Sequence, residues 1–327
     1  MFASFMRLRR EGSMMLNALA IVLEEPGRLA LSRLPIDTPG DADVVVATSW
    51  SGISTGTERL LYTGRMPDFP GMGYPLVPGY ETVGEVIEAG PESGFAVGQR
   101  VFAPGATCFG PVRGLFGGAA SHLVVKGSRI VAIPAELGDR GVLLALAATA
   151  YHARGGVAPQ GRELIVGHGV LGRLLARLSV IAGGEPTVWE CDPERNGGAD
   201  GYVVTDPAAD TRRDYQVIYD VSGDPGILDD LIARLAPGGE IVLAGFYERP
   251  LAFTFPPAFL REARLRVAAQ WRPDDLAGVV RLVTDGRLSL DELITHRRFA
   301  LQAEDAYPIA FNDPRCLKMV LDWRAVA

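Results

Sequence analysis

The sequence contains little of what a disulfide-rich or nucleic-acid-binding protein requires. Three of its 327 residues are cysteine, and they stand far apart at Cys108, Cys191 and Cys316. An odd number of distant cysteines builds neither a disulfide framework nor a cysteine-rich zinc lobe, which predicts a reducing compartment, the cytoplasm. The 39 acidic residues outnumber the 32 basic ones and leave a formal net charge of −7. We therefore expect no nucleic-acid partner, because phosphate backbones are bound by basic surfaces.

Long hydrophobic runs are also missing. A membrane-spanning helix needs about 18 consecutive apolar residues, and the longest candidate, residues 142–150, is too short. We therefore expect no membrane span. A basic stretch followed by an apolar run at residues 14–23 imitates a signal sequence, but the run ends in two glutamates without a small-residue cleavage site. Residues 1–14 are interpreted as an N-terminal extension.

The composition, 48% hydrophobic and 22% charged, suits a folded protein of about two domains. The pattern divides near residue 135. Before that point lie short β-rich runs separated by glycine and proline, at residues 18–23, 43–50, 82–89, 99–103 and 120–125. After it, β-branched strands alternate with helical segments, which predicts βαβ units on a parallel sheet. A helix over 303–311 and a final strand over 316–321 are expected at the end.

A glycine-rich motif lies between a predicted strand and a predicted helix. Gly167 permits a tight turn, Gly169 lets the backbone approach a pyrophosphate, and Gly172 allows the helix to pack closely on the strand. The helix N-terminus adds free N–H groups for a phosphate. At about the 20-residue offset typical of this motif, Glu190 ends the next strand, where an acid binds ribose hydroxyls. Together these features predict a dinucleotide site.

Glu190 also bears on the choice of cofactor. A carboxylate accepts hydrogen bonds from a ribose diol but repels a 2′-phosphate, which favours NAD over NADP. Arg195 and Arg173 lie near in the sequence and leave NADP as an alternative. The expected cofactor-binding residues are Gly167, Gly169, Val170, Leu171, Gly172, Glu190, Ser222 and Gly245.

Five segments are similar to known conserved patterns: residues 50–58 (C-G-I-C-G-T-D), 77–86 (P-G-H-E-x-x-G-x-V), 97–101 (V-G-D-R-V), 149–153 (T-A-Y-H-A) and 235–245 (L-x-x-G-G-x-I-V-x-x-G). On these segments, nearly the whole chain after about residue 15 resembles the medium-chain dehydrogenase/reductase superfamily. The resemblance implies an α/β fold, with a doubly wound parallel Rossmann sheet and a GroES-like, mostly β domain. It places a GroES-like substrate domain at 15–135, a Rossmann NAD-binding domain at 136–295, and a C-terminal return to the first domain at 296–327.

The zinc ligands of that superfamily are replaced in this chain. By the resemblance, the cysteine ligand falls on Ser54 and the histidine on Tyr80. A further ligand falls near Ala145, while the glutamate next to the histidine is kept as Glu81. Serine and tyrosine are poor zinc ligands beside thiolate and imidazole, so we expect no metal site. The candidates for accepting a hydroxyl proton are Tyr80, Glu81, Ser54 and Thr57.

These candidates have structural interpretations as well. Glu81 is equally compatible with an ion pair that buttresses the domain interface, and Tyr80 with a packed aromatic ring whose hydroxyl caps a loop. His152 is expected to be a core or cofactor-facing histidine rather than a base. His168, inside the glycine loop, is expected to touch the cofactor phosphate or solvent.

Residues 51–58, 61–67 and 69–81 further resemble zinc-free members of the superfamily that act in bacteriochlorophyll synthesis. This resemblance implies a small-molecule tetrapyrrole substrate, whose 3-(1-hydroxyethyl) group is oxidised to 3-acetyl by hydride transfer to NAD. A flat macrocycle requires a wide apolar cleft. The loop at 62–74 is one expected wall, and the segment with Pro256, Phe259 and Trp271 is the other.

Two other functions stay open. One is a zinc-free quinone or enone reductase that uses NADPH, which Glu190 disfavours. The other is a non-catalytic protein that binds a tetrapyrrole or senses NADH. The resemblance also implies a homodimer, for which residues 240–245 are expected to form an exposed edge strand.

Overall fold

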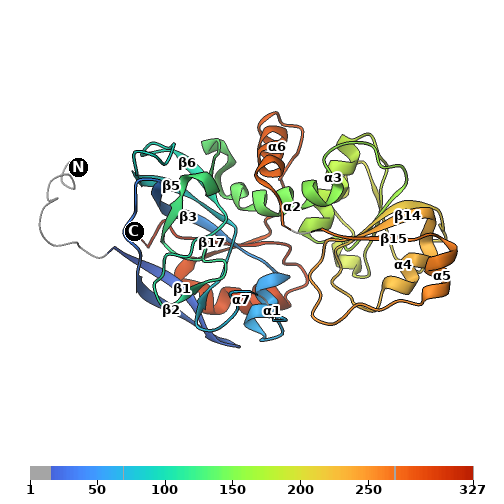
Figure 1. The fold of residues 1–327 in the computed structure, drawn as a ribbon, viewed down its shortest axis with the longest axis horizontal. Helices are drawn as coiled ribbons and strands as arrows, with labels where there is room; N and C mark the ends of the chain where they lie inside the picture. Colours follow the sequence, from blue (N-terminus) through green and yellow to red (C-terminus); the bar gives the residue numbers. More distant parts are fainter. Residues whose placement is uncertain (1–15, 69, 269, 327) are drawn as a thin grey trace, which may run out of the picture.

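The structure is a computed structural model and describes residues 16–68, 70–268 and 270–326. The expected N-terminal extension lies outside the described residues. Two lobes are joined by α2 (Leu144–Arg154), against which α6 (Pro273–Thr284) packs (Figure 1). Within the described residues, no helix is both long enough and apolar enough to cross a membrane. Short 3-10 helices cover Gly127–Arg129, Ala135–Leu143, Pro193–Arg195 and Ala300–Gln302.

The first lobe contains two β-sheets. The larger has the strand order β16-β17-β3-β5-β6-β9, and β8 also pairs with β3. Its strands are β3 (Asp43–Ile53), β5 (Thr82–Ala89), β6 (Arg100–Ala103), β8 (His122–Lys126), β9 (Val131–Ala132), β16 (His296–Phe299) and β17 (Met319–Asp322). The smaller sheet, in the order β2-β1-β4-β7, consists of β1 (Asn17–Glu25), β2 (Arg28–Pro35), β4 (Leu76–Val77) and β7 (Arg113–Gly114).

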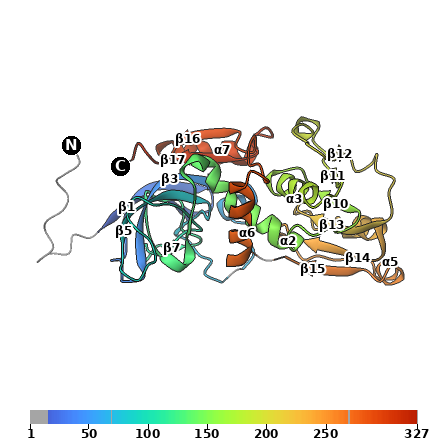
Figure 2. The same cartoon turned by 90° about the horizontal axis from the view of Figure 1, so that it is seen from above.

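The C-terminal residues complete the larger sheet. β17 pairs antiparallel with β3, so that Met319 lies opposite Ile53 and Asp322 opposite Trp50. Helix α7 (Ala303–Asn312) packs into the core of the same lobe, beside β17 (Figure 2). A strand near the C-terminus and a strand from the first 53 residues therefore lie side by side in one sheet. The short helix α1 (Thr57–Tyr62) follows β3 in this lobe.

The second lobe is a six-stranded parallel sheet in the order β12-β11-β10-β13-β14-β15. Its strands are β10 (Glu163–Val166), β11 (Thr187–Trp189), β12 (Val203–Thr205), β13 (Tyr215–Asp220), β14 (Leu235–Leu243) and β15 (Arg264–Val267). The helices of this lobe are α3 (Val170–Ile181), α4 (Leu228–Arg234) and α5 (Phe255–Leu260). The strand order reverses between β10 and β13, where sheets of this type bind ligands at their carboxyl ends.

The predicted fold class, a doubly wound parallel sheet beside a mostly β lobe, is confirmed. The proposed edge strand is wrong, because residues 240–243 belong to β14, which pairs with β13 on one side and β15 on the other. The edge strand on this side of the sheet is β15, where Val267 is exposed. Local sequence patterns identify strands but do not rank them across a sheet. The exact domain boundaries stay predictions.

Candidate active site

The glycine-rich loop joins β10 to α3 at the reversal point of the parallel sheet. Helix α3 begins at Val170, directly after its N-cap residue Gly169. A Cβ atom at Gly169 would meet no other heavy atom within 4 Å, whereas one at Gly172 would lie 1.8 Å from the carbonyl oxygen of Gly167. The loop is therefore open above Gly169 and tightly packed at Gly172. This shape fits a pyrophosphate held at a helix N-terminus.

Glu190 directly follows β11 and faces the glycine loop. Its Oε2 accepts a hydrogen bond from the backbone N–H of His168 at 3.1 Å. Its Oε1 accepts one from the backbone N–H of Asp192 at 3.0 Å. Because the side chain is only partly buried and each carboxylate oxygen accepts more than one hydrogen bond, acceptor sites are left for a ribose diol.

Ser222 and Gly245 follow the neighbouring strands β13 and β14. The backbone N–H and the hydroxyl of Ser222 both donate to Asp220 Oδ1, at 2.9 and 2.7 Å. The N–H of Gly245 donates to the backbone carbonyl of Asp220 at 3.0 Å, and Tyr247 Oη donates to Asp220 Oδ2 at 2.8 Å. The predicted cofactor-binding residues thus lie at the carboxyl edge of the sheet. Asp220, which was not predicted from the sequence, holds Ser222 and Gly245 there by hydrogen bonds.

His168 was expected to touch the cofactor phosphate or solvent. Its side chain is fully buried, so it does not contact solvent. Nδ1 lies 2.7 Å from the carbonyl oxygen of Arg195, and Nε2 lies 2.9 Å from Tyr202 Oη. Burial lowers the pKa of His168 to about 4. The ring is therefore neutral at pH 7: Nδ1–H donates to the carbonyl, and Nε2 accepts from the tyrosine hydroxyl. The histidine holds the chain beyond β11 against the glycine loop.

The two arginines considered for binding a 2′-phosphate are bonded to backbone carbonyls. Arg173 is buried, and it donates from Nε to the carbonyl of His168 at 3.0 Å and from Nη2 to that of Arg195 at 2.9 Å. Arg195 donates from Nε to the carbonyl of Pro314 at 2.9 Å. Each guanidinium thus has a structural task.

Three of the four catalytic candidates meet at the start of α1. Ser54 Oγ lies 2.7 Å from Tyr80 Oη, and Thr57 also forms a hydrogen bond with Tyr80. The Tyr80 ring packs edge-on against Phe116, with 5.2 Å between ring centroids. Burial raises the pKa of Tyr80 above its ordinary value, so the phenol keeps its proton at neutral pH. These hydroxyl groups form a chain that both donates and accepts protons.

Glu81, the fourth candidate, is engaged in a buried ion pair. Lys318 Nζ donates to Oε1 and Oε2 of Glu81 at 2.8 and 2.7 Å, and to the carbonyl of Ile53 at 3.1 Å. Burial raises the pKa of Glu81, and the Lys318 ammonium opposes that shift. The pair joins the start of β5 to the residue before β17. Of the two interpretations left open, this geometry favours the buttressing one, here within the first lobe.

A second buried carboxylate, Glu58 on α1, was not identified as a candidate from the sequence. Its Oε1 accepts a hydrogen bond from the backbone N–H of Ser54 at 3.0 Å, and its Oε2 accepts one from Tyr307 Oη at 2.8 Å. Burial raises the pKa of Glu58 to about 7. The available signal was its position directly after Thr57, where the C-G-I-C-G-T-D segment carries an acid.

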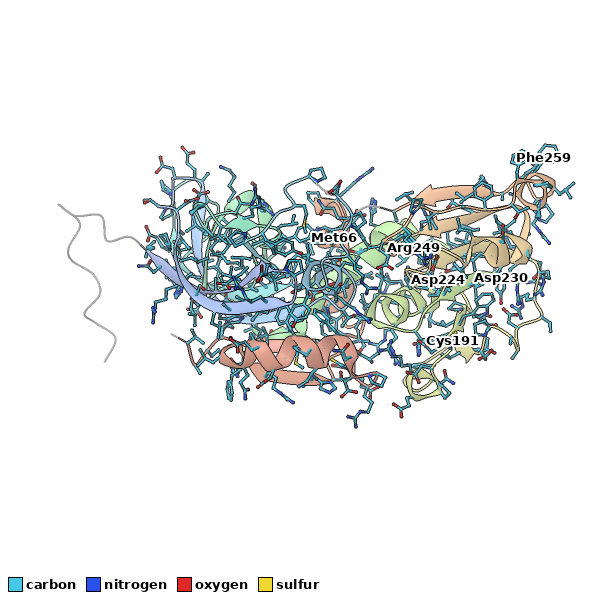
Figure 3. The ribbon with its side chains drawn as sticks, turned by 90° about the horizontal axis from the view of Figure 1, so that it is seen from below. Met66, Cys191, Asp224, Asp230, Arg249 and Phe259 are labelled. Carbon is cyan, nitrogen blue, oxygen red and sulfur yellow. The ribbon has the colours of Figure 1, made fainter. Side chains whose placement is uncertain are left out.

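The Phe259 part of one expected wall of the substrate cleft is wrong. Phe259 on α5 lies at the end of the second lobe farthest from Met66 (Figure 3) and lines a surface cavity of about 460 Å³ with Phe253 and Phe255. Met66 packs on a small core cluster in the first lobe, and Trp271 packs against Phe102 with 6.5 Å between ring centroids. Phe69 lies outside the described residues.

His152 lies on α2. Its Nδ1 is 2.8 Å from Asp275 Oδ2, a hydrogen bond that joins α2 to α6.

Comparisons with known proteins give the family. Residues 40–135 match the alcohol dehydrogenase GroES-like domain. The chain is 58% identical over 314 residues to the 2-desacetyl-2-hydroxyethyl bacteriochlorophyllide A dehydrogenase of Cereibacter sphaeroides, covering 94% of this chain and 99% of that protein. It is 55% identical over 306 residues to the protein of the same name from Rhodobacter capsulatus, covering 93% and 98%. The chain belongs to this family of bacteriochlorophyllide dehydrogenases.

The family is one of alcohol dehydrogenase-type oxidoreductases in the medium-chain superfamily, as the sequence resemblance predicted. The fold agrees, since an alcohol dehydrogenase of Escherichia coli CFT073 in complex with NADH superposes with a TM-score of 0.78 at 22% identity, covering 94% of this chain and 99% of that one.

In this chain, the side chains at the superfamily's zinc positions do not fit a metal ion. Ser54 Oγ is bonded to Tyr80, Ala145 has no ligand atom, and both Glu81 oxygens are bonded to an ammonium group. Across the described ranges, no group of three or more His, Cys, Asp or Glu side chains is placed to hold a metal. Hydroxyl and ammonium groups are not the ligands that zinc prefers.

Proposed function

We propose that this protein oxidises the 3-(1-hydroxyethyl) group of a bacteriochlorophyllide to a 3-acetyl group by hydride transfer to NAD, in bacteriochlorophyll synthesis. The observation that carries the proposal is the sequence identity of 58% and 55% to two proteins, over nearly their full length, that are named for a hydroxyethyl bacteriochlorophyllide. The glycine loop, the ribose-facing acid and the hydroxyl chain supply the parts that such a reaction needs.

The residues at the sheet edge fit a nicotinamide dinucleotide. The open space above Gly169 and the free N–H groups of α3 suit the pyrophosphate, while Val170 and Leu171 form the first helical turn beneath it. Ser222 and Gly245, held by Asp220, border the neighbouring strand ends. When bound, the nicotinamide ring supplies the hydride acceptor.

NAD rather than NADP is favoured by the charges around the ribose position. Glu190 presents a carboxylate there, which suits a diol and repels a phosphate. Arg173 and Arg195, the two cations that would otherwise compensate, are bonded to backbone carbonyls. Moving Arg173 to a phosphate would take this donor from the buried carbonyl of His168, at a cost of about 1 to 3 kcal/mol.

The hydroxyl proton of the substrate is assigned to the chain of Ser54, Thr57 and Tyr80. A neutral Tyr80 hydroxyl accepts that proton while passing its own to Ser54, and Ser54 releases its hydroxyl proton to water, so the pair needs no tyrosinate. The substrate carbon adjoins a conjugated macrocycle, which delocalises positive character as hydride leaves. This delocalisation offsets part of the charge stabilisation that zinc gives other members of the superfamily.

A homodimer is proposed through the sheet edge at β15. Leu265 and Val267 on that strand are exposed, as are the neighbouring side chains Phe259 and Leu260 of α5. An unpaired strand with apolar side chains is suited to pairing with a second copy of itself. Sedimentation of the wild type should give a dimer and that of Val267→Glu a monomer; a wild-type monomer would contradict the proposal.

The deciding experiment measures NADH formation optically when the purified protein meets 3-hydroxyethyl bacteriochlorophyllide and NAD after treatment with a strong chelator, with NADP in parallel. We expect turnover with NAD that chelation leaves unchanged, accompanied by a shift of the pigment absorption band. Binding of pigment and NAD without turnover would instead indicate a carrier or sensor. Turnover of quinones with NADPH would indicate a reductase.

A further inference from the structure

We infer that Glu58 is a positioning residue for the Ser54–Tyr80 hydroxyl pair, and that its charge controls how readily the pair takes up the hydroxyl proton of the substrate. The inference rests on the proposed alcohol oxidation and adds a residue to which no role has been given so far. Its basis is a fully buried carboxylate that is bonded to the backbone of Ser54, the residue whose hydroxyl meets that of Tyr80.

The geometry connects Glu58 to the pair through Ser54. The Ser54 backbone N–H donates to Glu58 Oε1 at 3.0 Å, while the hydroxyl of the same residue bonds Tyr80 at 2.7 Å. In return, the Glu58 N–H donates to the Ser54 carbonyl at 3.1 Å. Three hydrogen bonds therefore hold the serine, and the carboxylate fixes the backbone of the residue whose hydroxyl faces Tyr80.

The far side of the carboxylate is closed by α7. Tyr307 Oη donates to Glu58 Oε2 at 2.8 Å, and the Tyr307 side chain is itself buried. Its ring packs on Phe311 and near Tyr62, with centroids 5.7 and 6.4 Å away. Tyr307 and the aromatic rings packed on it close this side of the acid, and the Glu58 side chain is fully buried, which favours its neutral form.

The other groups that act on Glu58 are Glu81, Lys318 and Tyr80. The Glu81 charge raises the pKa of Glu58 and the Lys318 ammonium lowers it. Because Lys318 is bonded to both Glu81 oxygens, the effects of these two opposite charges on the pKa of Glu58 largely cancel. Burial raises the pKa of Glu58 to about 7, against the opposing hydrogen bonds from Ser54 and Tyr307. The acid therefore changes charge near neutral pH.

The consequence for catalysis follows from where the proton goes. During oxidation the substrate C–H bond breaks with its electron pair, which leaves as hydride to the nicotinamide, and the O–H bond releases its proton to Tyr80. Tyr80 passes its own hydroxyl proton to Ser54, and Ser54 releases its hydroxyl proton to water, so that one proton reaches solvent for each hydride transferred. Positive charge develops on the hydroxyl pair while the proton is in transit, and an ionised Glu58 behind the pair stabilises it. A protonated Glu58 does not.

The test compares the pH dependence of kcat for the wild type, Glu58→Gln and Tyr307→Phe at saturating NAD and pigment. The wild-type rate should rise through pH 7, and Glu58→Gln should lose that rise together with about tenfold or more of kcat. Tyr307→Phe should move the rise to higher pH, because the carboxylate loses a donor that stabilises its charge. Tyr215→Phe is the matched control, since it removes a tyrosine hydroxyl bonded to a different carboxylate, Asp210, in the second lobe. It should keep the wild-type profile.

A wild-type pH profile in Glu58→Gln, merely scaled down, would show a structural role and overturn the inference. NMR of carboxyl-labelled glutamate gives a second readout that needs no turnover. We expect one signal that titrates near pH 7, is absent in Glu58→Gln and titrates at higher pH in Tyr307→Phe. Absence of such a signal would refute the inference on its own, whereas its presence without turnover on the pigment would leave Glu58 as described and refute the proposed function.

Discussion

Lys318 holds both carboxylate oxygens of Glu81, at 2.8 and 2.7 Å, in a place where neither side chain reaches water. Lys318 directly precedes β17 and Glu81 directly precedes β5, so the pair ties the C-terminal return to the sheet of the first lobe. Such a pair repays its desolvation cost only while both charges are present. Its loss should therefore affect the folding of the whole first lobe.

We expect Lys318→Met to destabilise the protein by about 3 to 5 kcal/mol, because it leaves the Glu81 charge buried and unpaired. The double variant Lys318→Met with Glu81→Gln should recover part of that loss, as no charge then remains. Urea unfolding measures both. Arg28→Met is the control, since Arg28 pairs with Glu24 on the surface and should cost about 1 kcal/mol or less. Equal losses at the buried and surface pairs would contradict the prediction.

Tyr80→Phe should lower kcat by about 100-fold or more, the range in which a positioned proton-transfer group contributes. NAD binding should stay close to that of the wild type, because the glycine loop and Glu190 belong to the other lobe. Steady-state kinetics and NADH fluorescence titration separate the two effects. A variant that keeps its full kcat would show that Tyr80 serves packing against Phe116 alone.

Glu190→Ala should raise the KM for NAD about tenfold with little change in kcat, since it removes binding that is equal in ground and transition states. It should also narrow the preference for NAD over NADP, because the carboxylate no longer repels a 2′-phosphate. Arg195→Ala provides the comparison: with its guanidinium bonded to Pro314, it should leave that preference unchanged. An unaltered KM in Glu190→Ala would remove this residue from the cofactor site.

The free energy of unfolding should decrease as the pH is lowered, and part of this decrease should come from His168. Its pKa is about 4 in the folded protein against an ordinary value of 6.5, so the unfolded chain binds more protons between these values. The stabilising effect of the neutral ring is complete above pH 6.5 and is lost as the pH falls to about 4, by up to about 3 kcal/mol. Urea unfolding at pH 7.5 and 4.5 should show a smaller pH effect in His168→Gln. The same pH effect in both proteins would rule this out.

Features formed by residues close together in the sequence could be predicted, whereas features formed by residues far apart in the sequence could not. The glycine loop and Glu190 were predicted because both belong to one strand-helix-strand unit, whose pattern is local. Ser54, Thr57 and Tyr80 came from a family resemblance, and the structure brings them within hydrogen-bonding distance. Their catalytic roles stay predictions.

The partners of these residues depended on tertiary structure. Lys318 is 237 residues from Glu81, and Tyr307 is 249 residues from Glu58. No local pattern links residues so far apart, and a single lysine or tyrosine in a C-terminal segment carries no motif. The pairing of β17 with β3 brings Lys318 to its partner, and the packing of α7 in the same lobe brings Tyr307.

The sequence by itself therefore determined the parallel sheet and the glycine-rich loop, because these follow from residue types at short spacings, and the resemblance to the superfamily identified the replaced zinc ligands. Only the tertiary structure decided which strand forms the sheet edge, that the His168 ring is buried and neutral, and which of two carboxylates is neutralised by a lysine. Burial and charge pairing arise when distant segments pack together, and they set the proton affinity of each group.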